Sequence, residues 1–283
     1  MSSFIRPARS ITSLSPKELH KYLKGPKTHP LHLTGLISSW PALEKWKLSD
    51  GLKEMRDSLG AEKVVEIELG KQGRGYLHSD WQRVNMGFGI FLDAFIFNLI
   101  PSSMPKSELP SAYLAQSDLL DNSPKLAEGV PPLPHFYEGA EKSLYRRTVW
   151  IGPEKSFTPF HKDPYIGIYS QIVGSKTFHA LPPEAAQHLS PSNLARHTNT
   201  SQIPLPVSRI FQSSEPSLAP DDLAVLPKDV LDICRSQLEK AFKMKGACAV
   251  ELKAGESVLV PEGWWHAAEG GDGPGVGVGA WFR

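Results

Sequence analysis

Short apolar runs predict that the second half of the chain is built from β-strands. Three runs of strand length occupy the middle of the chain, and four more follow near its end. They are Leu144–Gly152, Tyr165–Val173, Lys176–Leu181, Ala247–Leu252, Ser257–Pro261, Trp265–Glu269 and Val276–Phe282. Gly and Pro residues separate several of these runs, as is typical of strands joined by turns. The pattern therefore predicts that the second half of the chain is mainly β.

The first third of the chain carries helix signals. Ser15-Pro-Lys-Glu18 combines an N-cap serine, a proline in the first turn and a glutamate that completes a capping box. Short helices are expected near Ala42–Leu59, and the apolar run Gly87–Leu99 predicts a buried helix. Two strands (Leu31–Thr34 and Val64–Leu69) and one later helix (Asp229–Phe242) complete the pattern. The expected fold class is mainly β with flanking helices.

Composition and charge fit a globular enzyme. An apolar fraction of 40% supports a sizeable core, and a net charge of +1 gives no general attraction to nucleic acid or anionic membranes. The longest apolar stretch, 88–100, is broken by Asp93 and Asn98 and is shorter than a bilayer span, so no membrane segment is expected. Two cysteines, Cys234 and Cys248, are too few for a disulfide framework. They indicate a reducing, intracellular compartment, the cytoplasm or the nucleus.

Two histidines and one aspartate form the strongest candidate site. His161 and Asp163 lie in the predicted strand Phe157–Asp163, where residues i and i+2 project to the same face, so that both can bind one ion. His266 follows another apolar segment, about a hundred residues later. Two imidazoles and one carboxylate on one face of a metal leave open coordination positions, as in non-haem Fe(II) oxygenases. The ligand types alone also permit zinc.

Lys176 is a second candidate, thirteen residues after Asp163 at the start of another predicted strand. A buried lysine there can pair with the far carboxylate of a dicarboxylic co-substrate, whereas a solvated strand charge is the alternative. His179 competes as a metal ligand. In a strand, however, Lys176 and Phe178 share one face and His179 points to the other. We expect Lys176 to face the pocket and His179 to face away from it.

The order and spacing of several short motifs resemble one known family. The motifs are Pro30-Leu-His-Leu-Thr-Gly35 with Trp40-Pro41, Tyr113-Leu-Ala-Gln116, Trp150-Ile-Gly-Pro153, Thr158-Pro159, the His161/Asp163 pair, Gly174-Ser-Lys176 and Trp281-Phe282. Together they resemble the JmjC-domain, cupin-like 2-oxoglutarate oxygenases. Within that family the small arginyl and lysyl hydroxylases look most similar, with the asparaginyl hydroxylase factor inhibiting HIF more distant.

The resemblance implies a fold, a set of ligands and a reaction. The fold is a double-stranded β-helix (jelly-roll) barrel with a helical N-terminal portion. Fe(II) is expected on His161, Asp163 and His266, and 2-oxoglutarate on Tyr113, Thr158 and Lys176, with Lys176 at its distal carboxylate. The implied reaction consumes O2 and 2-oxoglutarate, releases succinate and CO2, and hydroxylates a side chain of a protein or peptide.

Two departures from the family pattern concern the co-substrate. The family usually has an asparagine four residues after the metal-binding aspartate, on what we expect to be the same strand, and this chain has Gly167. The last strand, which usually carries small polar residues, reads Gly275-Val-Gly277-Val-Gly279. Glycine removes side-chain hydrogen bonds and allows close backbone approach. Weaker 2-oxoglutarate binding, a different acid and a roomier pocket are all compatible with these changes.

The expected domain organisation is a disordered tail over residues 1–14 and one domain over 15–283. Within that domain we expect a helix-rich part (15–110), a barrel core from about 111 to 283 and an insert (183–246). Pro- and Ser-rich connections run through Ile100–Pro110, Asn122–Pro134 and Pro191–Pro227. They are either solvated linkers or rim loops that shape a substrate groove. The third connection lies between the two halves of the candidate metal motif, which favours a groove and lid.

Other functions share this sequence pattern. Gly167 and the glycine-rich last strand are compatible with a catalytically silent JmjC-like binding module, and the ligand set is compatible with a non-oxygenase cupin. Within the oxygenases, histone lysine demethylation and RNA hydroxylation compete with protein hydroxylation. The near-neutral charge disfavours RNA. The sequence does not predict an oligomeric state.

Overall fold

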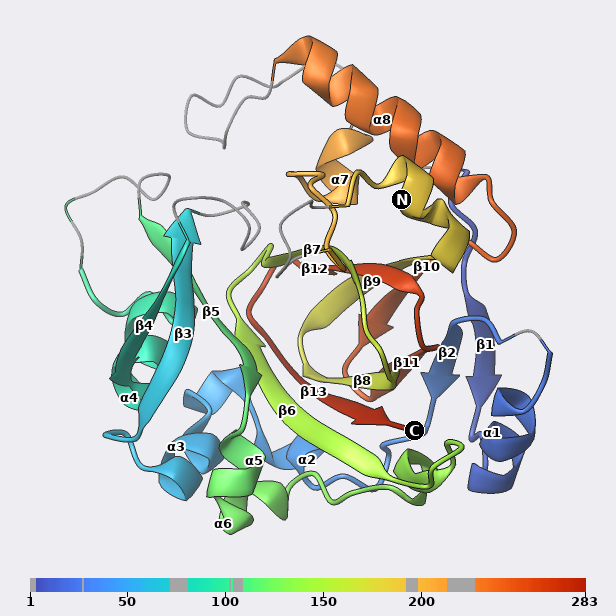
Figure 1. Cartoon of the computed structure of the whole chain (residues 1–283). Helices are drawn as coiled ribbons and strands as arrows, with labels where there is room; N and C mark the ends of the chain where they lie inside the picture. Colours follow the sequence, from blue (N-terminus) through green and yellow to red (C-terminus); the bar gives the residue numbers. More distant parts are fainter. Residues whose placement is uncertain are drawn as a thin grey trace.

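Two facing β-sheets form the centre of the protein (Figure 1). The computed structural model describes residues 4–26, 28–71, 81–101, 103, 109–191, 198–212 and 227–283. In the larger sheet the strand order is β1-β2-β11-β8-β13-β6-β5-β3-β4, and in the smaller sheet it is β10-β9-β12-β7. Apart from the parallel pair β1/β2, the paired strands run antiparallel. The mainly β, double-stranded β-helix class is thereby confirmed.

The strands lie close to the predicted runs. Their bounds are β1 Arg9–Thr12, β2 Leu31–Thr34, β3 Val64–Lys71, β4 Gln82–Gly87, β5 Pro110–Ser117, β6 Leu144–Gly152, β7 Phe157–Lys162, β8 Ile166–Val173, β9 Ser175–Leu181, β10 Cys248–Lys253, β11 Glu256–Val260, β12 Trp265–Gly270 and β13 Gly275–Phe282. The sequence pattern missed β1, β4 and β5. The prediction of a disordered tail is wrong for residues 9–12, because β1 pairs with β2 and the preceding Ile5 is buried.

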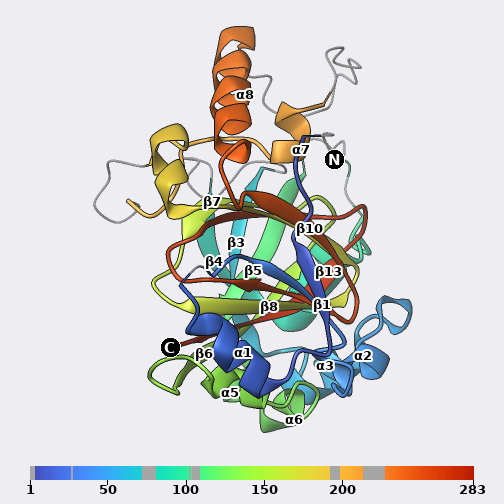
Figure 2. The same cartoon turned by 90° about the vertical axis from the view of Figure 1, so that its right-hand side faces the viewer.

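Helices cover the two outer sides of this sandwich. The helices and turns that precede β6 in the chain are α1 Pro16–Leu23, α2 Ala42–Lys45, the 3₁₀ turn η1 Leu48–Asp50, α3 Lys53–Leu59, α4 Phe88–Phe91, the π turn η2 Leu92–Ile96, α5 Leu119–Asn122, α6 Pro124–Ala127 and the 3₁₀ turn η4 Pro134–Tyr137. The insert contributes the 3₁₀ turn η5 Pro183–His188, α7 Val207–Ile210 and α8 Lys228–Phe242. Figures 1 and 2 place α8 on one side of the barrel and α1, α5 and α6 on the opposite side.

Local sequence explains where helices begin and end. Ser15 caps α1 as predicted: its hydroxyl accepts the Glu18 backbone N–H while the Glu18 carboxylate accepts the Ser15 backbone N–H. The helix expected over Gly87–Leu99 is shorter than predicted. It ends at Ile96, and Leu99 beyond it is exposed.

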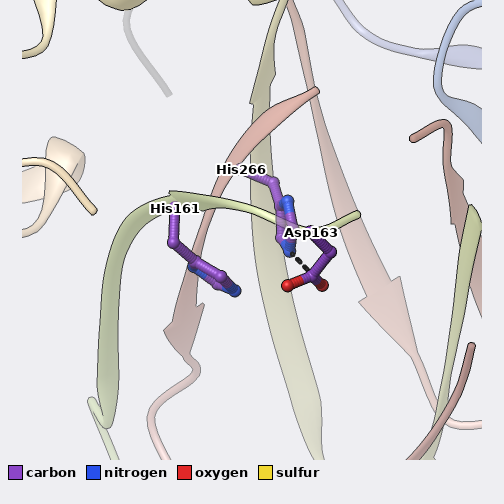
Figure 3. Close-up of side chains that lie close together, drawn as sticks. All are labelled: His161, Asp163 and His266. Atoms are coloured by element: carbon purple, nitrogen blue, oxygen red, sulfur yellow. Dashed lines mark ion pairs between the residues drawn. The ribbon is translucent and has the colours of Figure 1, made fainter. Parts of the chain in front are cut away.

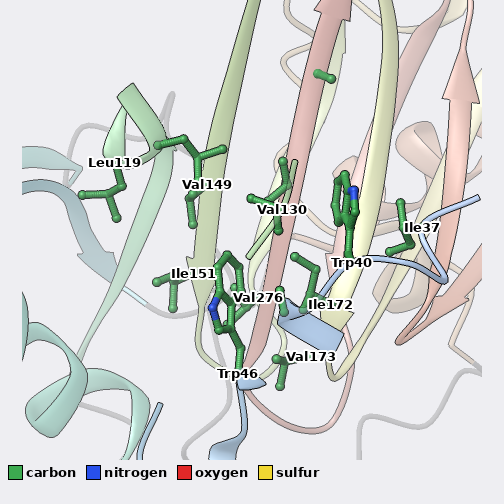
Figure 4. Packing of buried hydrophobic residues seen from close by; sticks show 14 of the residues in the cluster. Ile37, Trp40, Trp46, Leu119, Val130, Val149, Ile151, Ile172, Val173 and Val276 are labelled. Atoms are coloured by element: carbon green, nitrogen blue, oxygen red, sulfur yellow. The ribbon is translucent and has the colours of Figure 1, made fainter. Parts of the chain in front are cut away.

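Alternation along β13 assigns its two faces. Val276, Val278, Ala280 and Phe282 pack into the core shared with the N-terminal helices. That core also holds Trp40 and Trp46 against strands β6 and β8 (Figure 4). The intervening glycines and Trp281 therefore face the space between the sheets. The glycine-rich pattern of this strand is thus confined to its inner face.

The insert packs on the outer face of the smaller sheet. Leu238 and Phe242 of α8 join Phe160, Leu181 and other outward-facing residues of this sheet in one apolar cluster. Earlier in the insert, residues 199–201 run beside the edge of β7: the backbone N–H of Ser201 donates to the Phe160 carbonyl, and that of Lys162 to the Asn199 carbonyl. This segment therefore borders the strand that carries His161.

Candidate metal centre and co-substrate pocket

The structure brings His161, Asp163 and His266 together between the two sheets (Figure 3). One potential ligand atom from each lies within 4.8 Å of the others. The imidazole rings have centroids 4.2 Å apart, and His266 Nε2 lies 3.7 Å from Asp163 Oδ2. His161 is on β7 and His266 is the Cα partner of His161 on β12. Among the described residues, this is the cluster of His, Cys, Asp and Glu with the geometry of a metal site.

A β-bulge in β7 places two predicted site residues on one face. Thr158 and His161 are three residues apart, so a regular strand would point them in opposite directions. Their partners on β12 are Ala268 and His266, which are only two residues apart. The extra residue in β7 restores the common direction, and both side chains line the same pocket. The sequence carries no signal for this bulge.

Backbone carbonyls orient both imidazoles. His161 Nδ1 lies 2.9 Å from the Pro159 carbonyl oxygen, and His266 Nδ1 lies 3.2 Å from that of Trp264. A carbonyl only accepts, so each Nδ1 carries the proton and each Nε2 presents its lone pair to the centre. Burial, together with the nearby His161, lowers the pKa of His266. The ring is therefore held in the neutral, ligating form.

Asp163 lies in a turn, one residue beyond the end of β7. The indole N–H of Trp281 donates to its Oδ2 at 2.8 Å. Burial raises the pKa of this carboxyl, but the two imidazoles and the Trp281 hydrogen bond outweigh it, so that the net shift is downward. The prediction that Gly167 continues the strand of Asp163 is wrong, because Gly167 belongs to the next strand, β8.

Lys176 is buried at the inner end of the pocket, as predicted. Its Nζ donates to Tyr113 Oη at 2.8 Å and lies 5.1 Å from the centre of the Tyr169 ring. Burial lowers the pKa of Lys176 to about 7. Thr158 lines the same pocket. All three residues expected at the co-substrate are therefore close together, and Lys176 is not a solvated charge.

Aromatic side chains and glycines shape the pocket. The space enclosed by the pocket together with its open mouth is about 560 Å³. Its walls include Trp150, Tyr169, Phe178 and Trp281. Gly277 and Gly279 provide room for these rings: a Cβ on Gly277 would lie 2.1 Å from Tyr169 Oη, and one on Gly279 would lie 2.7 Å from the Trp281 ring. The unusual last strand is thus matched to bulky neighbours.

A polar groove continues outward from the pocket. The two share Tyr113, Trp150, Thr158, His161 and Asp163, and the groove extends along β3, β4 and β5. Asn199 and Thr200 of the insert also line it, which agrees with the groove role expected for this segment. A lid role for the insert stays a prediction. Sequence reasoning missed Glu68, which lies in the groove as the Cα partner of Tyr113.

The other competing residues lie away from the pocket. His179 faces the outer side of the smaller sheet, where its Nε2 is 3.2 Å from Glu269 Oε1, so its expected exclusion from the metal group is confirmed. Trp265 is buried in the cluster beneath α8, and Trp264 is buried in the apolar layer between the sheets. Both are therefore packing residues. Cys234 and Cys248 are buried free thiols. Among the described residues, no helix is long and apolar enough to cross a membrane.

Comparison with known families supports this assignment of the fold. The cupin-like domain family matches residues 18–283. The chain belongs to this family. Its similar proteins include JmjC oxygenases, so the expected membership of the JmjC-domain, cupin-like oxygenases is confirmed. Enzymes of the JmjC family use Fe(II) and 2-oxoglutarate.

Several curated relatives of this cupin-like chain carry demethylase names. Lysine-specific demethylase JMJ30 of Arabidopsis thaliana is 27% identical over 237 residues, covering 84% of this chain and 46% of that protein. Lysine-specific demethylase 8 of Xenopus tropicalis is 24% identical over 239 residues, covering 84% and 44%. HSPB1-associated protein 1 of Homo sapiens is 30% identical over 137 residues, covering 48% and 23%. The chain spans less than half the length of these relatives.

Proposed function

We propose that this chain is an Fe(II)- and 2-oxoglutarate-dependent oxygenase that hydroxylates a basic side chain of a protein. The observation that carries the proposal is the convergence of His161, Asp163 and His266 in one pocket whose inner end holds the buried Lys176. Two neutral imidazoles and one carboxylate fit Fe(II) with open coordination positions. The intracellular location expected from the cysteines remains part of this proposal.

Separate residues of the chain would hold the metal and the co-substrate. His161 and His266 would offer Nε2, and Asp163 would offer its carboxylate, which the Trp281 indole N–H holds at Oδ2. When bound, Fe(II) with 2-oxoglutarate and O2 supplies the oxidising chemistry, with succinate and CO2 as co-products. Protonated Lys176, with the hydroxyls of Tyr113 and Thr158, would hold the distal carboxylate and so orient the keto-acid end toward the three ligands.

The position of Glu68 in the groove favours a substrate with a basic side chain. The side chain of Glu68 is only 19% exposed, and its ion-pair partner Arg83 is distant at 3.7 Å and itself mostly exposed. Burial raises the pKa of Glu68, against the opposing effect of Arg83. A carboxylate in this position gains from a second cation. The guanidinium or ammonium group of a substrate in the groove would supply that cation while its carbon chain extends toward the metal centre.

Lysine demethylation is the second candidate, because two of the relatives described above are named lysine-specific demethylases. Oxidation of a methyl group on lysine uses the same site and releases that carbon as formaldehyde. Product mass separates the two reactions: hydroxylation adds one oxygen to the substrate, whereas demethylation removes one methyl carbon. A catalytically silent module would produce neither change and no succinate.

The deciding experiment measures succinate formation by purified protein loaded anaerobically with Fe(II), with Arg- and Lys-containing peptides as substrates. Mass spectrometry then identifies the product. We expect one added oxygen on a basic residue and no turnover in Asp163→Ala. In Glu68→Gln we expect that turnover needs a higher concentration of peptide but the same concentration of 2-oxoglutarate. Wild-type turnover in Asp163→Ala would refute the ligand assignment. Metal binding by the wild type without Fe(II)-dependent succinate formation would favour a non-oxygenase cupin or a silent module.

A further inference from the structure

The carboxylate of the candidate metal centre lacks the support of a strand. β7 ends at Lys162 and β8 begins at Ile166, so Asp163 lies between two ladders. Its carbonyl oxygen accepts the backbone N–H of Gly263 at 3.0 Å, which fixes the backbone but leaves the side chain free to rotate. By contrast, the two imidazoles are on paired strands and are oriented by backbone carbonyls. Something else must orient the Asp163 carboxylate.

Trp281 of β13 meets this requirement. Its indole N–H donates to Asp163 Oδ2 at 2.8 Å, across 118 positions of sequence. Two glycines leave room for the ring in this orientation. A Cβ on Gly279 would lie 2.7 Å from the Trp281 ring, and Gly167 is the Cα partner of Trp281 with its open face toward the indole. The glycines that depart from the family pattern therefore surround the side chain that holds the carboxylate.

Arg283 holds the same turn at a second point. Residues 281 and 283 project in the same direction from the end of β13. The Arg283 guanidinium donates to the Pro164 carbonyl oxygen through Nε at 3.2 Å and Nη2 at 2.7 Å, and it lies 4.4 Å from the centre of the Tyr165 ring. On its other face Tyr165 stacks on Tyr145 at 4.3 Å. The guanidinium thus fixes both residues that follow Asp163.

We propose that Trp281 and Arg283 are positioning residues that hold Asp163 in its metal-binding orientation. Trp281 fixes the rotation of the carboxylate through its hydrogen bond to Oδ2, the oxygen that also lies 3.7 Å from His266 Nε2, while Arg283 fixes the turn from which the side chain projects. Neither residue is proposed to touch the substrate. The inference rests on the proposed function, because it concerns the metal that His161, Asp163 and His266 are expected to bind.

The test measures metal affinity rather than turnover. Co(II) is titrated into metal-free wild type, Trp281→Phe and Arg283→Met by calorimetry and by the visible absorption of bound Co(II), and each metal-free protein is unfolded thermally. Loss of a residue that orients a metal ligand typically costs tenfold to a hundredfold in affinity. We expect a loss of about this size for Trp281→Phe, a smaller loss for Arg283→Met, and an altered Co(II) spectrum in Trp281→Phe.

Trp40→Phe is the matched control, because Trp40 is buried in the core away from the pocket and, among the described residues, its indole nitrogen has no hydrogen-bond partner. We expect it to retain wild-type Co(II) affinity. Gly279→Ala provides an independent variant that keeps the indole but displaces it. Weaker Co(II) binding there, with folding retained, would support the inference even if Trp281→Phe does not fold. If folded Trp281→Phe or Gly279→Ala binds Co(II) as tightly as the wild type, the positioning role is overturned but the proposed function is not. If the wild type itself does not bind Co(II), both the positioning role and the proposed function are overturned.

Discussion

Lys176 Nζ donates a 2.8 Å hydrogen bond to Tyr113 Oη, which joins β9 of the smaller sheet to β5 of the larger one at the inner end of the pocket. The ammonium group also faces the rings of Tyr113, Trp150 and Tyr169. Its hydrogen-bond partner is a neutral phenol, and burial lowers the pKa of Lys176 from 10.5 to about 7. The site is therefore arranged to gain from a carboxylate.

Binding of 2-oxoglutarate should weaken as pH rises above about 7. The dicarboxylate prefers protonated Lys176, and the free protein loses that proton near pH 7. Burial raises the pKa values of Tyr113 and Tyr169, so both phenols stay neutral through this range. Calorimetry on Zn(II)-loaded protein should show constant affinity below pH 6, a fall of up to tenfold per pH unit above 7, and proton uptake on binding.

Stability should depend on pH in the opposite sense. Between about pH 7 and 10.5 the unfolded chain binds the Lys176 proton and the folded chain does not, so this group makes the free energy of unfolding rise with pH. Lys176→Met should remove that contribution, as urea unfolding at several pH values would show. An unchanged pH dependence of both ligand affinity and stability in Lys176→Met would contradict the assignment.

Removing the Lys176 side chain should weaken the binding of 2-oxoglutarate far more than the binding of the metal. Loss of a charge-assisted partner of a buried carboxylate costs on the order of 2 kcal/mol or more, about thirtyfold in affinity. Lys176→Ala should therefore raise the 2-oxoglutarate concentration needed for turnover by about that factor, while Co(II) affinity stays near wild type. Lys253→Ala, at an exposed position of β10, is the control. Equal 2-oxoglutarate dependence in the two variants would remove Lys176 from the site.

Local sequence patterns predicted most of the strands and the two candidate ligands that lie on them, His161 and His266. The apolar runs locate β8, β9 and β13 to within one residue at either end. The bulge in β7 was not predictable, since it depends on the register with β12. The contact of Trp281 with Asp163 and the pairing of Glu68 with Tyr113 were not predictable for a related reason: the two residues of each pair are distant in sequence and adjacent only in the folded barrel.

A buried pair on the outer face of the smaller sheet should stabilise the packing of the insert. Glu269 lies 3.2 Å from His179, and its Oε1 accepts the Val207 backbone N–H at 2.6 Å at the start of α7. Burial raises the pKa of Glu269, but His179 and Ser208 outweigh it and the pKa is lowered, so the carboxylate is charged near neutral pH. Glu269→Gln should reduce the free energy of unfolding by about 1–3 kcal/mol in urea. Glu262→Gln, at an exposed site, should change it by less than about 0.5 kcal/mol. Equal stability of the two variants would show that the pair contributes nothing.

The last prediction concerns Gly167, where the family usually has asparagine. Although Gly167 lies on β8 and not on the strand of Asp163, it lines the pocket. A Cβ there would meet Trp281 Nε1 at 3.7 Å and the Val260 carbonyl oxygen at 4.0 Å, which are ordinary contacts. The backbone therefore accepts a side chain. One added neutral hydrogen bond contributes roughly 0.5–1.5 kcal/mol, so Gly167→Asn should tighten 2-oxoglutarate binding by a few-fold to about tenfold.

The competing outcome follows from the indole beside Gly167. If the glycine serves to leave space for Trp281 or for a bulkier acid, the amide would overpack the pocket at a cost of about 1–3 kcal/mol. Calorimetric titration of 2-oxoglutarate into Zn(II)-loaded Gly167→Asn, with Gly167→Ala as the variant that adds only the Cβ, distinguishes the two. Tighter binding in Gly167→Asn but not in Gly167→Ala requires a new hydrogen bond. Weaker binding in Gly167→Asn with wild-type affinity in Gly167→Ala would reject the missing hydrogen bond, because the pocket would then accept a Cβ and refuse the amide.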